Sequence, residues 1–166
     1  MTAYLVTRGM SISLIGVLRA IACITGLMGT CAFRLSASRI SLVGTGLWAI
    51  IYQFSWLSLS YISLFLEDDS QSLVLLILGV CLSRTGLYVF DISVSQIMQE
   101  NVPESLRGVV GGVQNSLNAF FGLLAFALGI IFPDPSEFYI YVLSGYSAVG
   151  VAMLLWYFGM FLKAQK

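Results

Sequence analysis

Residues 73–98 read LVLLILGVCLSRTGLYVFDISVSQIM, and among them only Arg84 and Asp91 are charged. A helix needs about 20 predominantly apolar residues to cross the hydrocarbon core of a bilayer. This run is longer than that. It also lacks the apolar–polar alternation over about 10 residues that a membrane β-strand would show. We therefore predict a transmembrane helix over residues 73–98.

Four more runs of the same kind flank this one, at residues 12–33, 42–66, 106–132 and 138–162. The 166-residue chain is 58% hydrophobic and 10% charged, whereas a soluble domain carries about 25% charged residues. The connections between the runs are short, so consecutive helices are expected to be antiparallel neighbours. The sequence thus predicts an all-α, multi-pass membrane protein. Residues 1–166 are expected to form a single transmembrane helical bundle embedded in a lipid bilayer.

The basic residues indicate how this bundle is oriented. Cytoplasmic loops carry an excess of Lys and Arg. One predicted side of the membrane carries Arg34, Arg39, Arg107, Lys163 and Lys166. The other side carries Glu67, Asp68, Asp69, Asp134 and Glu137. This distribution predicts an outside N-terminus and an inside C-terminus. An odd number of spans with an outside N-terminus is awkward for a chain that begins here without a signal sequence. Residues 1–8 are therefore interpreted as the tail of a segment that precedes this sequence.

Arg84 and Asp91 are the first candidates for function. They lie seven residues apart and therefore roughly on one face of the predicted helix. An ionised side chain in the bilayer costs about 2.5–3.5 kcal/mol on insertion scales, so neither is expected to face lipid. Two interpretations stay open: a gate or coupling pair that lines a wet cavity, or charges whose partners on other helices only fix the packing. Arg19 is interpreted as a snorkelling side chain or as a partner of a backbone carbonyl.

The fourth predicted helix carries a polar stripe. Gln114 and Asn118 share one face, and Asn115 lies beside them. Amide side chains within a membrane need hydrogen-bond partners, which neighbouring helices or water can supply. The stripe is therefore either a translocation surface or a set of interhelical hydrogen bonds.

A second stripe on the same helix consists of small residues. Gly108, Gly112 and Ser116 recur at every fourth position. Small residues at this spacing allow the backbone of another helix to approach closely. We expect this stripe to be a helix-packing surface.

Motifs that would support other function classes are missing from the sequence. The chain has no histidine, and its three cysteines do not form a CxxC pair. It also lacks a phosphate-binding glycine loop, a nucleophile elbow and paired catalytic carboxylates. Eight basic and eight acidic residues cancel, so net charge does not indicate a nucleic-acid partner. We predict a protein that is not an enzyme, without a cofactor, a resident metal site or a nucleic-acid partner.

Two blocks in the second half of the chain resemble a known family. Residues 83–91 (SRTGLYVFD) followed by 95–102 (SQIMQENV) resemble the tenth membrane helix of the ferroportins. Residues 104–118 (ESLRGVVGGVQNSLN) resemble the start of the eleventh. Residues 24–30 (ITGLMGT) and 42–47 (LVGTGL) fit the eighth and ninth helices. The similarity covers nearly the whole chain.

This resemblance implies a fold and a function. Ferroportins export iron(II) across the plasma membrane and have the major-facilitator fold, in which two six-helix halves rock around a central cavity. The chain would be most of the C-terminal half, its partner the N-terminal half, and its substrate iron(II) or another divalent metal. The family positions where the two halves close an inner gate correspond to Arg84, Asp91, Arg107 and Gly108.

The resemblance does not extend to a known metal site of the family. In vertebrate ferroportins one iron site uses a cysteine of the broken seventh helix and a histidine of the eleventh. The histidine corresponds to Ala125, a nearby aspartate corresponds to Gly122, and the cysteine would fall upstream of Met1. That cysteine also engages the hormone hepcidin, so we do not predict this partner. Two functions stay open: half of an iron(II) exporter, or a truncated, non-transporting protein that pairs with or modulates a full-length or N-half partner.

Overall fold

The computed structural model describes residues 5–6, 9–65, 69–132, 134 and 138–161. Within these residues the chain forms five long helices and a terminal π-helical turn. They are α2 (Ile12–Ala37), α3 (Leu42–Ser63), α4 (Asp69–Asn101), α5 (Glu104–Ile131), α6 (Phe138–Trp156) and η2 (Tyr157–Phe161). All five long helices are long and apolar enough to cross a membrane. The predicted all-α membrane fold is therefore confirmed.

The helices differ from the predicted ranges mainly at their polar ends. α2 continues to Ala37 rather than ending at residue 33, and α4 runs from Asp69 to Asn101 rather than over 73–98. α3 ends at Ser63, whereas the predicted end at residue 66 lies outside the described residues. Hydropathy marks the end of an apolar stretch, but a helix continues until a cap or turn satisfies its terminal backbone groups.

Serine side chains begin the first two long helices. Ser11 Oγ accepts the backbone N–H of Leu14 at 3.3 Å, and Ser41 Oγ accepts that of Gly44 at 3.1 Å. Such caps satisfy backbone donors that have no partner in the first helical turn. The cap at Ser41 follows directly on the end of α2, so the connection between α2 and α3 is a short turn.

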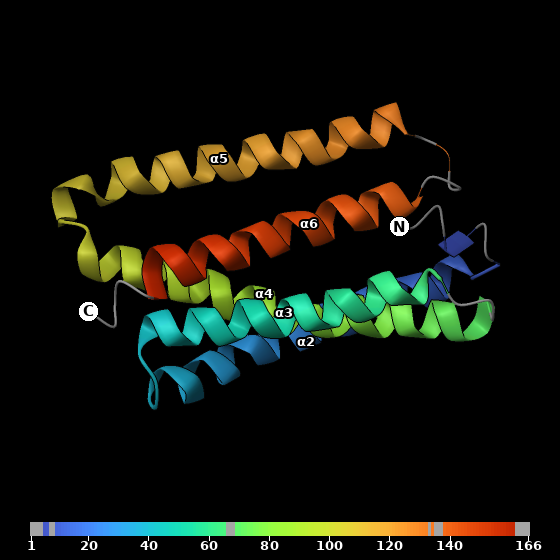
Figure 1. Ribbon diagram of the computed structural model, residues 1–166, viewed down its shortest axis with the longest axis horizontal. Helices are drawn as coiled ribbons and strands as arrows, with labels where there is room; N and C mark the ends of the chain where they lie inside the picture. The colour runs from blue at the N-terminus through green and yellow to red at the C-terminus, as the bar shows by residue number, and fades with distance from the viewer. Residues whose placement is uncertain (1–4, 7–8, 66–68, 133, 135–137, 162–166) are drawn as a thin grey trace.

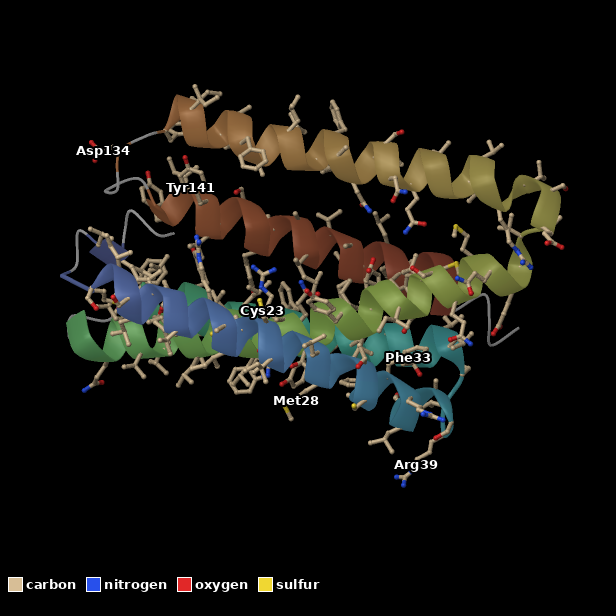
Figure 2. The ribbon with its side chains drawn as sticks, turned by 180° about the vertical axis from the view of Figure 1, so that it is seen from behind. Cys23, Met28, Phe33, Arg39, Asp134 and Tyr141 are labelled. Carbon is tan, nitrogen blue, oxygen red and sulfur yellow. The ribbon has the colours of Figure 1, made fainter. Side chains whose placement is uncertain are left out.

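The helices form a bundle with distinct ends (Figure 1). α2, α3 and α4 pack together, α6 lies against α3, and α5 is at the outer edge. The α2–α3 and α4–α5 connections lie at one end of the bundle, and the last residues of α3 and α5 lie at the other, beside the first residues of α4 and α6. Figure 2 shows Arg39 at the first end and Asp134 at the second. Arg39 and Asp134, which the charge pattern predicts on opposite sides of the membrane, thus lie at opposite ends of the folded bundle.

The contact between α3 and α4 is made by small residues. A Cβ atom added at Gly86 would lie 2.6 Å from the carbonyl oxygen of Ala49, so the two backbones are in direct contact there. Gly79 similarly faces the backbone of α3 near Ser60. Ser72 Oγ donates a 2.6 Å hydrogen bond to the carbonyl oxygen of Ser63. Van der Waals packing and interhelical hydrogen bonds of this kind drive helix association in membranes.

The contact between α2 and α4 fixes the register of these two helices. Thr25 Oγ1 donates to the carbonyl oxygen of Cys81 at 2.9 Å, and Thr85 Oγ1 donates to the carbonyl oxygen of Thr25 at 2.9 Å. Gly26 and Gly29 of α2 lie directly against the α4 segment that contains Thr85. The reciprocal hydrogen bonds hold the helices at one relative height.

Aromatic side chains attach α6 to α3. The ring of Tyr146 stacks between those of Phe54 and Tyr61, with centroid distances of 4.6 and 5.4 Å. At the other end of α6, Trp156 Nε1 donates to the carbonyl oxygen of Val43 at 3.1 Å. These contacts position the end of α6 next to the hollow described below.

α5 differs from the other helices because none of its residues is buried. A Cβ atom added at Gly108 or at Gly112 would meet no described atom within 4 Å outside the helix's own backbone. The small-residue stripe of this helix therefore does not pack against another described helix, and the prediction that it is a packing surface is wrong for this part of the chain. The glycines that do pack closely lie on α2, α3, α4 and α6.

Candidate functional site

A hollow of about 630 Å³ lies between the second half of α4, the first half of α5 and the end of α6. Its lining is mainly apolar, with amide groups from Asn101, Gln114 and Asn118. Met98 of α4 and Met160 of η2 contribute thioethers. The hollow exists because α5 crosses from its connection with α4 toward α6 while making few contacts with α4 along the way.

Only part of the predicted translocation surface lines this hollow. Gln114 and Asn118 both line it, whereas Asn115 does not. Residues four apart lie on one face of a helix, but the next residue along points about 100° away. The structure therefore brings two of the three predicted amides into one surface and places the third outside it.

Arg107 and Gly108 lie where α4 and α5 meet. Arg107 Nε donates a 3.0 Å hydrogen bond to the carbonyl oxygen of Val102, which holds the arginine against the connection between the helices. Both residues are exposed in this chain. The arginine thus closes the sharp turn and leaves its remaining N–H groups available.

Arg84 and Asp91 are both exposed in this chain, and their seven-residue spacing puts them roughly on one face of α4. Seven residues correspond to about 10 Å along a helix, and no ion pair joins the two side chains. Arg84 lies about 25 Å along α4 from Asn101 at the α4–α5 connection. Within this chain the structure therefore does not bring Arg84 together with Arg107. Asp91 lies on α4 between Arg84 and the α4–α5 connection.

Sequence reasoning did not connect Arg19 with Arg84. Arg84 lines a second hollow, of about 220 Å³, between α2 and α4, and Arg19 lines the same hollow. The charge in the middle of the first helix was visible in the sequence, but its neighbour on α4 depends on the register of the two helices. Among the described residues, His, Cys, Asp and Glu do not gather into any group of three or more that could hold a metal ion.

Comparison with known proteins identifies the family of this helix bundle. The family model described as Ferroportin1 (FPN1) matches residues 1–149. The chain belongs to the ferroportin family. Solute carrier family 40 member 1 of Arabidopsis thaliana is 42% identical to it over 156 residues. Ferroportin of Homo sapiens is 32% identical over 211 residues. Each match covers 94% of this chain.

Solved structures show the same fold. The crystal structure of a bacterial homologue of the iron transporter ferroportin in the outward-facing state superposes with a TM-score of 0.88 over 93% of this chain. The inward-facing state of such a homologue gives 0.81 over 86%. Sequence identity is 24% in both cases.

The ferroportin-family relatives are longer than this chain. The matches cover 30% of the Arabidopsis thaliana protein, 37% of the Homo sapiens protein and 38% of the outward-facing bacterial structure. The chain thus spans about a third of the length of the curated relatives it matches.

Proposed function

We propose that this chain acts as the C-terminal half of a ferroportin-like transporter that exports iron(II) from the cell across the plasma membrane. Family membership over residues 1–149 carries the proposal. The curated relatives are named as ferroportins and as members of solute carrier family 40. In major-facilitator-type transporters two helix bundles rock around a site near the middle of the membrane. A second bundle is therefore the expected partner of this one.

The translocation surface in this proposal is the amide-lined part of the α4–α5–α6 hollow. Gln114 and Asn118 are among the residues that line this hollow, and Asn115 lies beside them on α5. Amide oxygens are hard ligands and bind iron(II) more weakly than imidazole nitrogen does. We therefore expect these residues to guide a passing ion rather than to retain it, with stronger ligands coming from the opposite half.

The inner gate in this proposal draws on exposed charges of α4 and of the α4–α5 connection. Asp91 and Arg107 are exposed in this chain, so groups of an opposing half could reach them. Gly108 places open backbone next to Arg107. Arg84 lies about 25 Å along α4 from the α4–α5 connection. It would therefore meet the opposing half at a different depth in the membrane.

Iron(II) flux into reporter-loaded liposomes tests the proposal. We expect no flux from this chain alone, since alternating access requires two halves. Saturable flux is expected when the chain is reconstituted with a matching N-terminal half, and Asp91→Ala is expected to abolish it. Absence of flux from the combined halves would instead support a non-transporting protein that modulates a partner. Flux from this chain alone, lost in Asp91→Ala, would contradict the two-half mechanism and indicate a pore made by several copies.

A further inference from the structure

Hydrogen bonds attach helix α5 to its neighbours near both of its ends. At its first turn, Arg107 Nε donates to the carbonyl oxygen of Val102 at 3.0 Å. At its last turn, the hydroxyl oxygen of Tyr141 on α6 lies 2.9 Å from the carbonyl oxygen of Leu128 and 2.7 Å from that of Phe132. None of the residues of α5 is buried. The middle of this helix therefore lacks the close packing that joins α2, α3 and α4.

One face of α5, which we call its inward face, lines the hollow of about 630 Å³ between this helix, α4 and α6. The residues of the inward face recur at spacings of three and four positions, as expected for one side of a helix. They are Val110, Val113, Gln114, Leu117, Asn118 and Phe121. A partner on the opposite side of α5 would cover other residues. The free space therefore lies within this chain, between α5 and two of its own helices.

A weak point of α5 lies at Gly111 and Gly112. Glycine favours a helix less than any other residue except proline, and bends in helices occur at pairs of glycine or serine. Ser116 Oγ donates a 2.9 Å hydrogen bond to the carbonyl oxygen of Gly112, and such contacts often bend helices. A Cβ atom added at Gly111 would lie 3.9 Å from the terminal methyl group of Met98. The helix is thus easiest to bend beside its contact with the end of α4.

Tyr141 holds the far end of α5 from a fixed position. Its ring packs against the buried cluster of Leu5, Ile15 and Leu76. Its hydroxyl carries a single proton, which the carbonyl oxygens at the end of α5 share. A Cβ atom added at Gly129 would lie 3.8 Å from this hydroxyl oxygen. The end of α5 is therefore joined to the packed part of the bundle through one hydroxyl group.

We propose that α5 is a hinged lid over the α4–α5–α6 hollow, with its hinge at Gly111 and Gly112 and its latch at Tyr141. While the latch is closed, as in this structure, the inward face of α5 covers the hollow. When the hydroxyl releases the carbonyl oxygens, α5 pivots at the two glycines and opens the hollow. A bend of about 10° at the hinge moves Leu128, which lies about 24 Å farther along the helix, by about 4 Å.

Opening of the lid changes access to Gln114 and Asn118, the two amides of the proposed translocation surface that line the hollow. As a control of ion passage, this role rests on the proposed function. The movement itself needs neither an ion nor a second half, so it is measured in this chain without transport. Rocking of two halves is largely a rigid-body motion, whereas this lid moves within one half.

Distances between paired spin labels measure the movement in the purified chain, in a background without native cysteines. One pair joins Leu123→Cys on α5 with Ile51→Cys on α3, and the control pair joins Leu27→Cys on α2 with the same α3 position. All three side chains are exposed, so the labels need no repacking. The distance distribution of the α5 pair is expected to be about twice as wide as that of the control pair, because α2 and α3 both pack against α4.

Variants of the latch and the hinge are expected to change this width in opposite directions. Tyr141→Phe keeps the ring and removes the hydroxyl, so the distribution of the α5 pair is expected to widen. Replacement of both Gly111 and Gly112 by alanine strengthens the helix at the hinge and is expected to narrow it. The control pair is expected to keep its width in both variants.

Reaction with a maleimide measures access to the hollow. Gln114→Cys lies in the lining, whereas Ala119→Cys lies at an exposed position of α5 outside the lining. Tyr141→Phe is expected to raise the reaction rate of Gln114→Cys about threefold or more and to leave that of Ala119→Cys unchanged.

The wild-type chain and Tyr141→Phe decide the proposal, so the decision holds even if the glycine variant does not fold. A wide α5 distribution together with a selective effect of Tyr141→Phe on the α5 pair or on Gln114→Cys supports the lid. The proposal is overturned if the α5 pair is as narrow as the control pair, or if Tyr141→Phe changes neither quantity. It is also overturned if Tyr141→Phe changes the control pair or Ala119→Cys equally. Absence of iron(II) flux from the combined halves, with a moving lid, would overturn the proposed function alone.

Discussion

Replacement of Gly86 by alanine tests the helix contact on which the bundle depends. A Cβ atom at this position would lie 2.6 Å from the carbonyl oxygen of Ala49 and 3.0 Å from the backbone nitrogen of Gln53. Ordinary van der Waals contact begins near 3.4 Å. To reach it, α3 and α4 must move apart locally by about 0.8 Å. The atoms in the way belong to the backbone of α3, so a side-chain rotation cannot relieve the clash.

The size of the effect follows from two opposing contributions. Overpacking of a well-packed contact typically costs about 1–3 kcal/mol. Alanine offsets part of this, because its helix propensity exceeds that of glycine by about 1 kcal/mol. The free energy of unfolding is therefore expected to fall by up to about 2 kcal/mol. For a chain of this length that corresponds to a drop of up to about 8 °C in the midpoint of thermal unfolding.

Thermal unfolding in detergent, followed by tryptophan fluorescence, measures this shift. Gly112→Ala on α5 is the matched control, because a Cβ atom there meets no described atom within 4 Å. This control should keep or slightly raise the midpoint, since only helix propensity changes. Equal midpoints for Gly86→Ala and Gly112→Ala would refute the reasoning, because they would show that α3 and α4 are not in backbone contact at Gly86.

Thr85→Val removes the 2.9 Å hydrogen bond to the carbonyl oxygen of Thr25 but keeps the side-chain shape, so a loss of about 0.6–1.7 kcal/mol is expected in the same assay. An unchanged midpoint would count against the register of α2 and α4. Tyr146→Ala removes two stacked ring pairs between α6 and α3 and is expected to cost about 1–3 kcal/mol; a loss near zero would show that α6 is held by other contacts. In a variant without native cysteines, Ser136→Cys is expected to react with a membrane-impermeant maleimide in intact cells, and Ser38→Cys only after permeabilisation. Labelling at position 38 in intact cells would reverse the proposed orientation.

The membrane spans could be predicted from the sequence because hydropathy is a local property. Every helix expected from an apolar run is present, and α6 begins at Phe138, as predicted. The ends of α2 and α4 were placed too early because polar residues such as Asn101 continue a helix beyond the hydrocarbon core. The helix ends are decided by capping and turn geometry, which hydropathy does not describe.

The candidate site could be predicted only in part. Helical spacing placed Gln114 and Asn118 on one face of α5, and both line the hollow. It likewise placed Arg84 and Asp91 on one face of α4, where both are exposed. It could not show that Asn115 lies outside the hollow, because the spacing of residues within one helix does not give the positions of the neighbouring helices. The gate and the translocation surface stay predictions until flux is measured.

The sequence by itself determined that this protein is an all-α membrane bundle of the ferroportin family, because span length, charge placement and family motifs are written along the chain. The tertiary structure decided which residues meet. Gly108 and Gly112 had the spacing of a packing surface, yet Gly86 makes the close contact, because a contact also needs a partner helix on that face. Arg19 and Arg84 share a hollow only because hydrogen bonds between α2 and α4 set their relative height. Such registers depend on contacts between residues far apart in sequence, and no local pattern specifies them.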